Sequence, residues 1–62
     1  MNFNEEEREL FSEAGINIEN KTYTPEEAKT FSNKVVEHIM SFSKQEIPEV
    51  KKKYDNLLYK IS

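Results

Sequence analysis

The chain has 62 residues, which suffices for one small domain covering residues 1–62 and leaves little room for a large core. It contains no cysteine, so disulfide bonds and thiolate metal sites are excluded. Charged residues make up 34% and hydrophobic residues 35%, a composition close to that of disordered chains. Three tyrosines, four phenylalanines and a regular apolar pattern nevertheless predict a globular domain.

The net charge of −3 conceals an uneven distribution along the chain. Residues 1–27 hold eight acidic and two basic side chains, while residues 28–62 hold four acidic and seven basic ones. We therefore expect the two parts to attract each other in the fold. No apolar run approaches the roughly 18 residues that cross a bilayer, and the first residues are acidic, unlike a signal peptide. These features predict a cytoplasmic protein without membrane contact.

The first predicted helix covers residues 4–14. Asn4 precedes three glutamates, and Glu7 stands at the third helical position of a capping box. Gly15 is expected to end the helix in the left-handed conformation, which would bring Ile16 onto Phe11.

Residues 16–23 alternate between apolar and polar side chains before the turn-prone pair Asn20-Lys21. This pattern predicts an extended connector or a hairpin-like one, with Ile16 and Ile18 directed into the core. Whether these residues pair as strands stays open, because so short a ribbon has little stability of its own.

The most specific local signal is Thr24-Pro25-Glu26-Glu27. It combines a capping box with proline at the first helical position, where the missing N–H has no cost, and it opens a helix over residues 25–43. The apolar side chains of this helix spread over an arc wider than one helical neighbour covers, so it needs two neighbours. They are Ala28, Phe31, Val35, Val36, Ile39, Met40 and Phe42.

The third predicted helix covers residues 47–61. A start at Ser43, capped with Glu46, is the alternative, but it would place Pro48 where a helical hydrogen bond is lost. The three segments predict an all-α fold, a small three-helix bundle whose first two helices are joined by the connector. The predicted core consists of Leu10, Phe11, Ile16, Ile18, Ala28, Phe31, Val35, Ile39, Phe42, Val50, Tyr54, Leu57 and Ile61.

The sequence carries no recognisable catalytic, cofactor-binding or metal site. His38 is the single histidine, and the residues one turn away from it, Lys34 and Phe42, are not metal ligands. The glutamates near the start of the chain lack the glycine turn and the spacing of a calcium loop. We therefore predict that the protein is not an enzyme and needs no cofactor.

Two surface features suggest function. Met40 lies at the margin of the apolar stripe of the second helix, and Tyr59 lies well off the Ile47–Ile61 stripe of the third. Both are expected to be partly exposed, and exposed residues of these types are enriched at protein interfaces. The leading hypothesis is a non-catalytic protein-interaction or small regulatory module that binds another protein or a second copy of itself. The alternative is a nucleic-acid-binding domain that uses Lys51, Lys52 and Lys53, although the acidic net charge disfavours it.

Three segments also carry a resemblance to known sequences: residues 19–27, residues 39–43 and residues 54–58. Over about residues 16–60 the chain resembles short uncharacterised proteins of clostridia and related low-GC Gram-positive bacteria. The resemblance implies no particular function.

Overall fold

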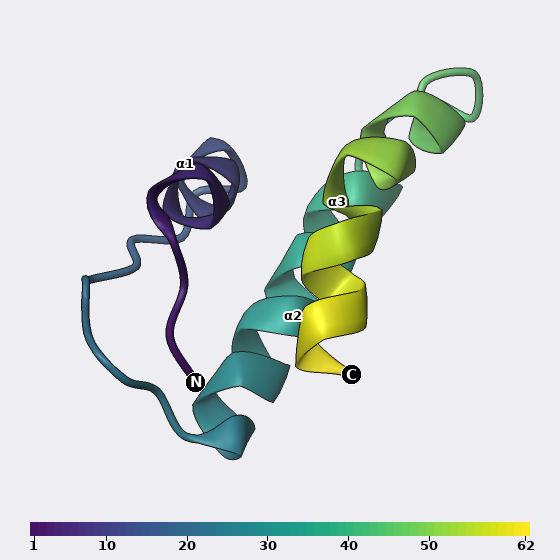
Figure 1. The fold of residues 1–62 in the computed structure, drawn as a ribbon. Helices are drawn as coiled ribbons and strands as arrows, with labels where there is room; N and C mark the ends of the chain where they lie inside the picture. Colours follow the sequence, from purple (N-terminus) through teal and green to yellow (C-terminus); the bar gives the residue numbers. More distant parts are fainter.

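The computed structural model describes residues 1–62 and contains three α-helices: α1 (Glu5–Glu13), α2 (Pro25–Met40) and α3 (Ile47–Ile61). No residue is in a β-strand, so the all-α prediction is confirmed. Helices α2 and α3 form a long antiparallel hairpin, and α1 is seen nearly end-on beside it, so its axis crosses that of the hairpin (Figure 1).

Helix α1 has the ends that its sequence predicts. The Asn4 side chain accepts a hydrogen bond from the Glu7 amide at 2.8 Å, and the Glu7 carboxylate accepts one from the Asn4 amide at 2.8 Å. At the other end Gly15 has a φ of 80°, the left-handed conformation that glycine adopts without strain. The Ile16 amide donates to the Phe11 carbonyl at 2.9 Å, which is the helix stop expected around Gly15.

The connector leaves α1 in an extended conformation and forms no strand pair within itself. Its last residue, Tyr23, instead exchanges two backbone hydrogen bonds with Met1, at 2.7 and 2.8 Å. Ile16 and Ile18 are buried as predicted. The short hairpin that was the alternative for residues 16–23 does not form.

Helix α2 begins at the predicted residue, Pro25, and ends earlier than predicted. Thr24 and Glu27 form the capping box, with hydrogen bonds of 3.0 and 3.1 Å. The predicted end at residue 43 is wrong, because the helix stops at Met40. Both the hydroxyl and the amide of Ser41 donate to the His38 carbonyl, which tightens the last turn.

Helix α3 begins at Ile47, which decides between the two predicted starts. The Ser43 hydroxyl donates to the Glu46 carboxylate at 2.8 Å and caps no helix amide. Pro48 therefore lies in the first turn of α3, where no N–H is required.

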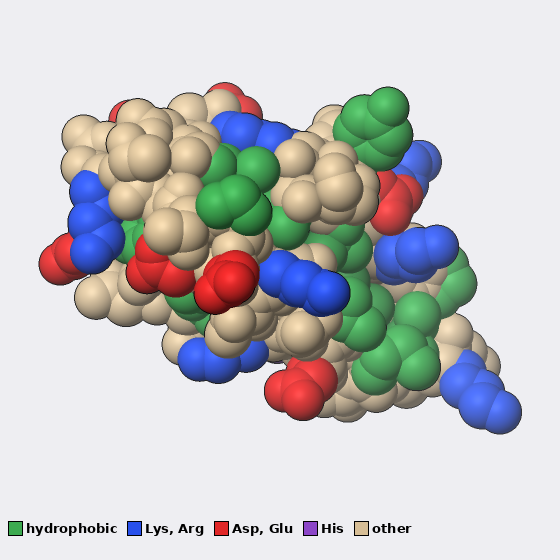
Figure 2. Space-filling view, turned by 90° about the horizontal axis from the view of Figure 1, so that it is seen from below, with side chains coloured by type: hydrophobic (Ala, Val, Ile, Leu, Met, Phe, Trp, Pro, Cys, Tyr) green, Lys and Arg blue, Asp and Glu red, His purple; other side chains and the backbone are tan.

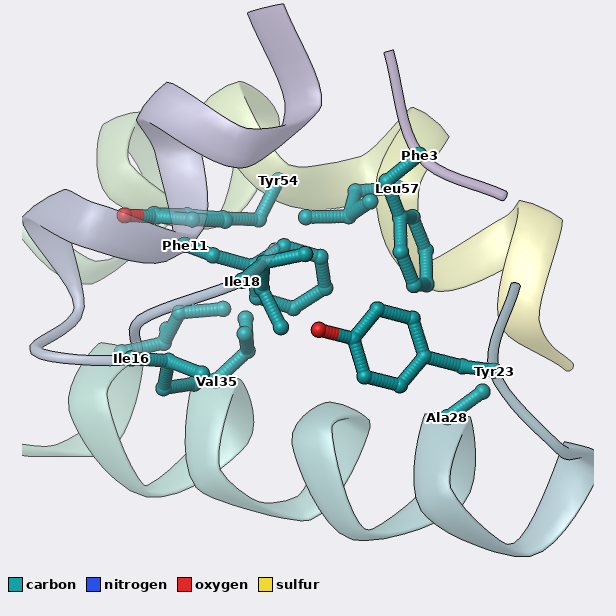
Figure 3. Packing of buried hydrophobic residues seen from close by; sticks show 10 residues of the cluster. Phe3, Phe11, Ile16, Ile18, Tyr23, Ala28, Val35, Tyr54 and Leu57 are labelled. Atoms are coloured by element: carbon teal, nitrogen blue, oxygen red, sulfur yellow. The ribbon is translucent and has the colours of Figure 1, made fainter. Parts of the chain in front are cut away.

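Side chains from all three helices and the connector meet in one apolar core (Figure 3). Eight predicted core residues are buried: Phe11, Ile16, Ile18, Ala28, Val35, Ile39, Tyr54 and Leu57. Four others pack on the core but stay partly exposed: Leu10, Phe31, Val50 and Ile61. The remaining predicted core residue, Phe42, is not part of this core. Its ring packs against the His38 ring, with 5.1 Å between centroids.

Two buried residues were missing from the predicted core, Phe3 and Tyr23. The Phe3 ring meets that of Phe11 edge-on at 4.9 Å, and the Tyr23 ring meets that of Phe31 at 5.2 Å. Each of these two residues immediately precedes a helix cap, the position from which an apolar side chain folds back onto its helix.

The acidic and basic parts of the chain attract each other as predicted. Lys60 of α3 pairs with Glu7 of α1 at 2.8 Å, and Lys53 of α3 pairs with Glu13 at the end of α1. The Tyr54 hydroxyl also donates to the Leu10 carbonyl at 2.9 Å. Polar contacts thus hold α3 to both ends of α1.

Candidate protein-interaction surface

The exposed side of α2 carries two large apolar side chains one helical turn apart. Val36 is 45% exposed and Met40 is 64% exposed. Residues four positions apart on a helix are neighbours on its surface. Val36 and Met40 therefore form one apolar strip on the outside of α2, which we call the α2 stripe.

The rest of the helix explains why the α2 stripe remains exposed. The ring of His38 faces the ring of Tyr54 in α3, with 5.9 Å between centroids. Residues two positions apart on a helix point in nearly opposite directions. Because Val36 and Met40 each lie two positions from His38, both point away from α3.

The wide apolar arc of α2 therefore has its two neighbours within the same chain. Helix α3 covers one side, and Phe11 of α1 meets Phe31 of α2 edge-on at 5.8 Å. The connector adds Ile16 and Ile18 to the same core. The remaining margin of the arc is the α2 stripe, whose two side chains the rest of the chain covers only in part.

Tyr59, the other predicted interaction residue, is 83% exposed on α3. It lies twelve residues along α3 from Ile47, which corresponds to about 18 Å of helix. Because the hairpin is antiparallel, Met40 lies near Ile47 and thus at the opposite end from Tyr59 (Figure 1). The structure does not bring Met40 and Tyr59 together. Instead, Met40 lies next to Val36 on α2. The sequence placed Val36 in the apolar arc of this helix but did not identify it as an interaction residue.

The three consecutive lysines of α3 do not share one face. Successive residues of a helix are 100° apart, so Lys51, Lys52 and Lys53 point in three directions. The ammonium group of Lys53 is bound to the carboxylate of Glu13, and this hydrogen bond raises the pKa of Lys53. Lys51 and Lys52 are the exposed members of the set that make no salt bridge.

The remaining surface is described by its hollows, its acidic and histidine side chains and its apolar areas. The structure has no pocket and no group of three His, Asp or Glu side chains positioned to hold a metal ion. None of the three helices combines the length with the apolar composition that a bilayer crossing demands. In the view of Figure 2, hydrophobic side chains reach the surface among lysines and acidic residues, most extensively on the side of the α2–α3 hairpin.

No family model, curated protein or solved structure matches the chain. The resemblance to short clostridial proteins therefore stays a prediction.

Proposed function

We propose that this protein is a non-catalytic interaction module, and that the α2 stripe is the surface at which a partner protein docks. The observation that carries the proposal is the exposure of Val36 and Met40 side by side on a helix whose other apolar residues are covered. Complete burial of such a side chain contributes about 1.5–3 kcal/mol to an association. Methionine also adapts its shape to different partners, which suits it to a docking surface.

The partner is expected to be another protein with an apolar patch of its own. A standard interface covers about 800 Å² on each side, more than two side chains provide. The contact must therefore extend onto the polar residues around the α2 stripe. Lys29, Asn33 and Glu37 lie on the same outer side of α2. The polar residues that surround the α2 stripe therefore include both a basic and an acidic side chain, as the polar rim of an interface often does.

Binding of a second copy through the α2 stripe is the alternative for the partner. It would make the protein a dimer that dissociates when Met40 becomes polar. A cytoplasmic location accompanies the proposal, because a domain of this size in an oxidising compartment usually relies on disulfide bonds and this chain has no cysteine.

Nucleic-acid binding has less support from the geometry. Lys53 is engaged by Glu13, and the two remaining lysines point in different directions on α3. Two phosphate contacts supply only a small part of the electrostatic affinity that duplex binding draws from six to ten.

The proposal is tested by affinity capture from the native cell with three tagged proteins. They are the unsubstituted chain, the double variant Val36→Ser/Met40→Ser, and Lys34→Ser as the matched control, because Lys34 lies on the opposite side of α2 from Val36. We expect the unsubstituted chain and Lys34→Ser to retain a partner that the double variant loses. Equal capture by all three proteins would contradict the proposal. Unchanged thermal unfolding of the double variant serves as the control for folding, since both residues are exposed.

A further inference from the structure

The turn that joins α2 to α3, Ser41–Glu46, lacks the features that usually end a helix. It contains no glycine, and none of its residues has a positive φ. Ser41 has φ −78° and ψ −11°, and Glu46 has φ −86° and ψ −27°, so both ends of the turn have helical backbone geometry. Nothing in the backbone of these two residues prevents a helix from continuing.

Helical hydrogen bonds extend into the turn from both sides. The amides of Ser41 and Phe42 donate to the carbonyls of His38 and Ile39, at 3.1 and 3.2 Å. On the other side, the amide of Ile47 donates to the Ser43 carbonyl at 3.0 Å, which is the spacing of an α-helix. Only the amides of Ser43, Lys44 and Gln45 make no backbone hydrogen bond. The chain thus departs from a continuous helix over very few residues.

Pro48 is the residue that opposes such a helix. In the hairpin it lies in the first turn of α3, where its missing N–H has no consequence. In a continuous helix from Pro25 to Ile61 it would lie in the interior. It could not donate to the Lys44 carbonyl there, and its ring would clash with that carbonyl.

We infer that the Ser41–Glu46 turn is a hinge at which two copies of the chain can exchange α3, and that Pro48 keeps it closed. In the exchanged dimer, α3 of each copy packs on α2 of the other. The partner is a second copy because opening the hinge removes α3 from the rest of its own chain and uncovers Tyr54 and Leu57, which are 1% and 2% exposed in the closed chain. The surface that fits them is the one that α3 has left, which a second copy also presents.

Exchange of α3 is independent of the proposed function. It concerns the buried contact between α2 and α3, whereas the proposed docking surface is the exposed α2 stripe. Loss of partner capture and loss of α3 exchange can therefore be observed separately.

The test compares the sedimentation of three proteins refolded from denaturant over a range of concentrations. They are the unsubstituted chain, Pro48→Ala, and Pro25→Ala as the matched control, because Pro25 opens α2 outside the hinge. We expect Pro48→Ala to dimerise with a dissociation constant at least about 100-fold below that of the unsubstituted chain, since the penalty of an interior proline is removed at both hinges. Pro25→Ala should behave like the unsubstituted chain.

The shape of the dimer and its internal contacts give two further readouts. A helix of 37 residues, from Pro25 to Ile61, is about 55 Å long, whereas the longest dimension of the closed chain is 35 Å. X-ray scattering should show this elongation. In a dimer of labelled and unlabelled copies, isotope-filtered NMR should detect the contact between the His38 and Tyr54 rings as one between molecules.

A second variant keeps the test decisive. Adding Ser43→Gly to Pro48→Ala should weaken the dimer by roughly fivefold, because glycine disfavours the helical conformation more than serine does at each of the two hinges. A Pro48→Ala protein that remains monomeric at every concentration would overturn the inference. So would a dimer in which the His38–Tyr54 contact stays within one molecule. Should Pro48→Ala fail to fold, the same two measurements on Pro48→Ser decide the question.

Discussion

Individual apolar side chains differ in how deeply they are buried, and this difference determines how much each contributes to stability. Leu57 is 2% exposed and Phe11 is 0% exposed, so their removal would leave cavities. Val36 is 45% exposed and has water on one side. Stability should therefore respond strongly to truncation at the first two positions and weakly at the third.

Leu57→Ala should lower the free energy of unfolding by about 2–5 kcal/mol, as truncation of a buried leucine does. Chemical denaturation measures the loss, with Val36→Ala as the control that changes stability by about 0.5 kcal/mol or less. A loss below about 1 kcal/mol for Leu57→Ala would mean that the core lies elsewhere.

The buried residues that spacing did not predict, Phe3 and Tyr23, lie outside the helices. Helical periodicity applies only within a helix, so it gives no signal for a side chain that folds back from the preceding residue. Phe42 shows the opposite error. It follows the apolar spacing of α2, but the helix ends before it, and its ring then meets His38.

The elements are determined mainly by their caps. Thr24 and Glu27 cap α2 reciprocally, and Asn4 with Glu7 does the same for α1. Both caps were predictable because they require specific residues at fixed spacing. The end of α2 was not, since a serine hydroxyl that bonds back to the chain can act at several successive positions.

Thr24→Ala should lower the free energy of unfolding by about 0.5–2 kcal/mol, because the amide of Glu27 loses its acceptor at the start of α2. Thr24→Ser is the matched control, since serine keeps the hydroxyl and caps helices well. A denaturation midpoint of Thr24→Ala equal to that of the unsubstituted chain would refute the role of this cap.

At the scale of the whole molecule, charge joins the two ends of the chain. Lys60 near the end of α3 donates to the Glu7 carboxylate in α1 and also to the Asn2 carbonyl at 2.7 Å. The asymmetry of charge along the sequence predicted this attraction, but not the residues that pair. Which lysine pairs with which glutamate depends on how α1 crosses the α2–α3 hairpin. No local sequence pattern predicts that crossing.

These contacts make stability depend on pH on the acid side. Burial alone would raise the pKa of Glu7, but the hydrogen bonds from Lys60 and the Asn4 amide hold it below the ordinary value of 4.5. A carboxyl group with a lowered pKa stabilises the fold above its unfolded pKa, and this contribution is lost as the pH falls through the folded value. The midpoint of thermal unfolding should therefore decrease below about pH 4.5.

The variant Glu7→Gln should show a smaller decrease of that midpoint over the same pH range. Glu5→Gln is the matched control, because Glu5 is exposed in the first turn of α1 and makes no salt bridge. An equal pH dependence of the unsubstituted chain and Glu7→Gln would show that the pairing with Lys60 does not contribute.

The central claim is that α2 has both of its helical neighbours within one chain, and the proposed function adds that the α2 stripe binds a different protein rather than a second copy. The sedimentation mass of the purified, unsubstituted chain tests this claim most directly. We expect a single species of 7.4 kDa across micromolar concentrations, the mass of one chain. A stable species of twice that mass would contradict the account, because a second copy would then cover part of α2.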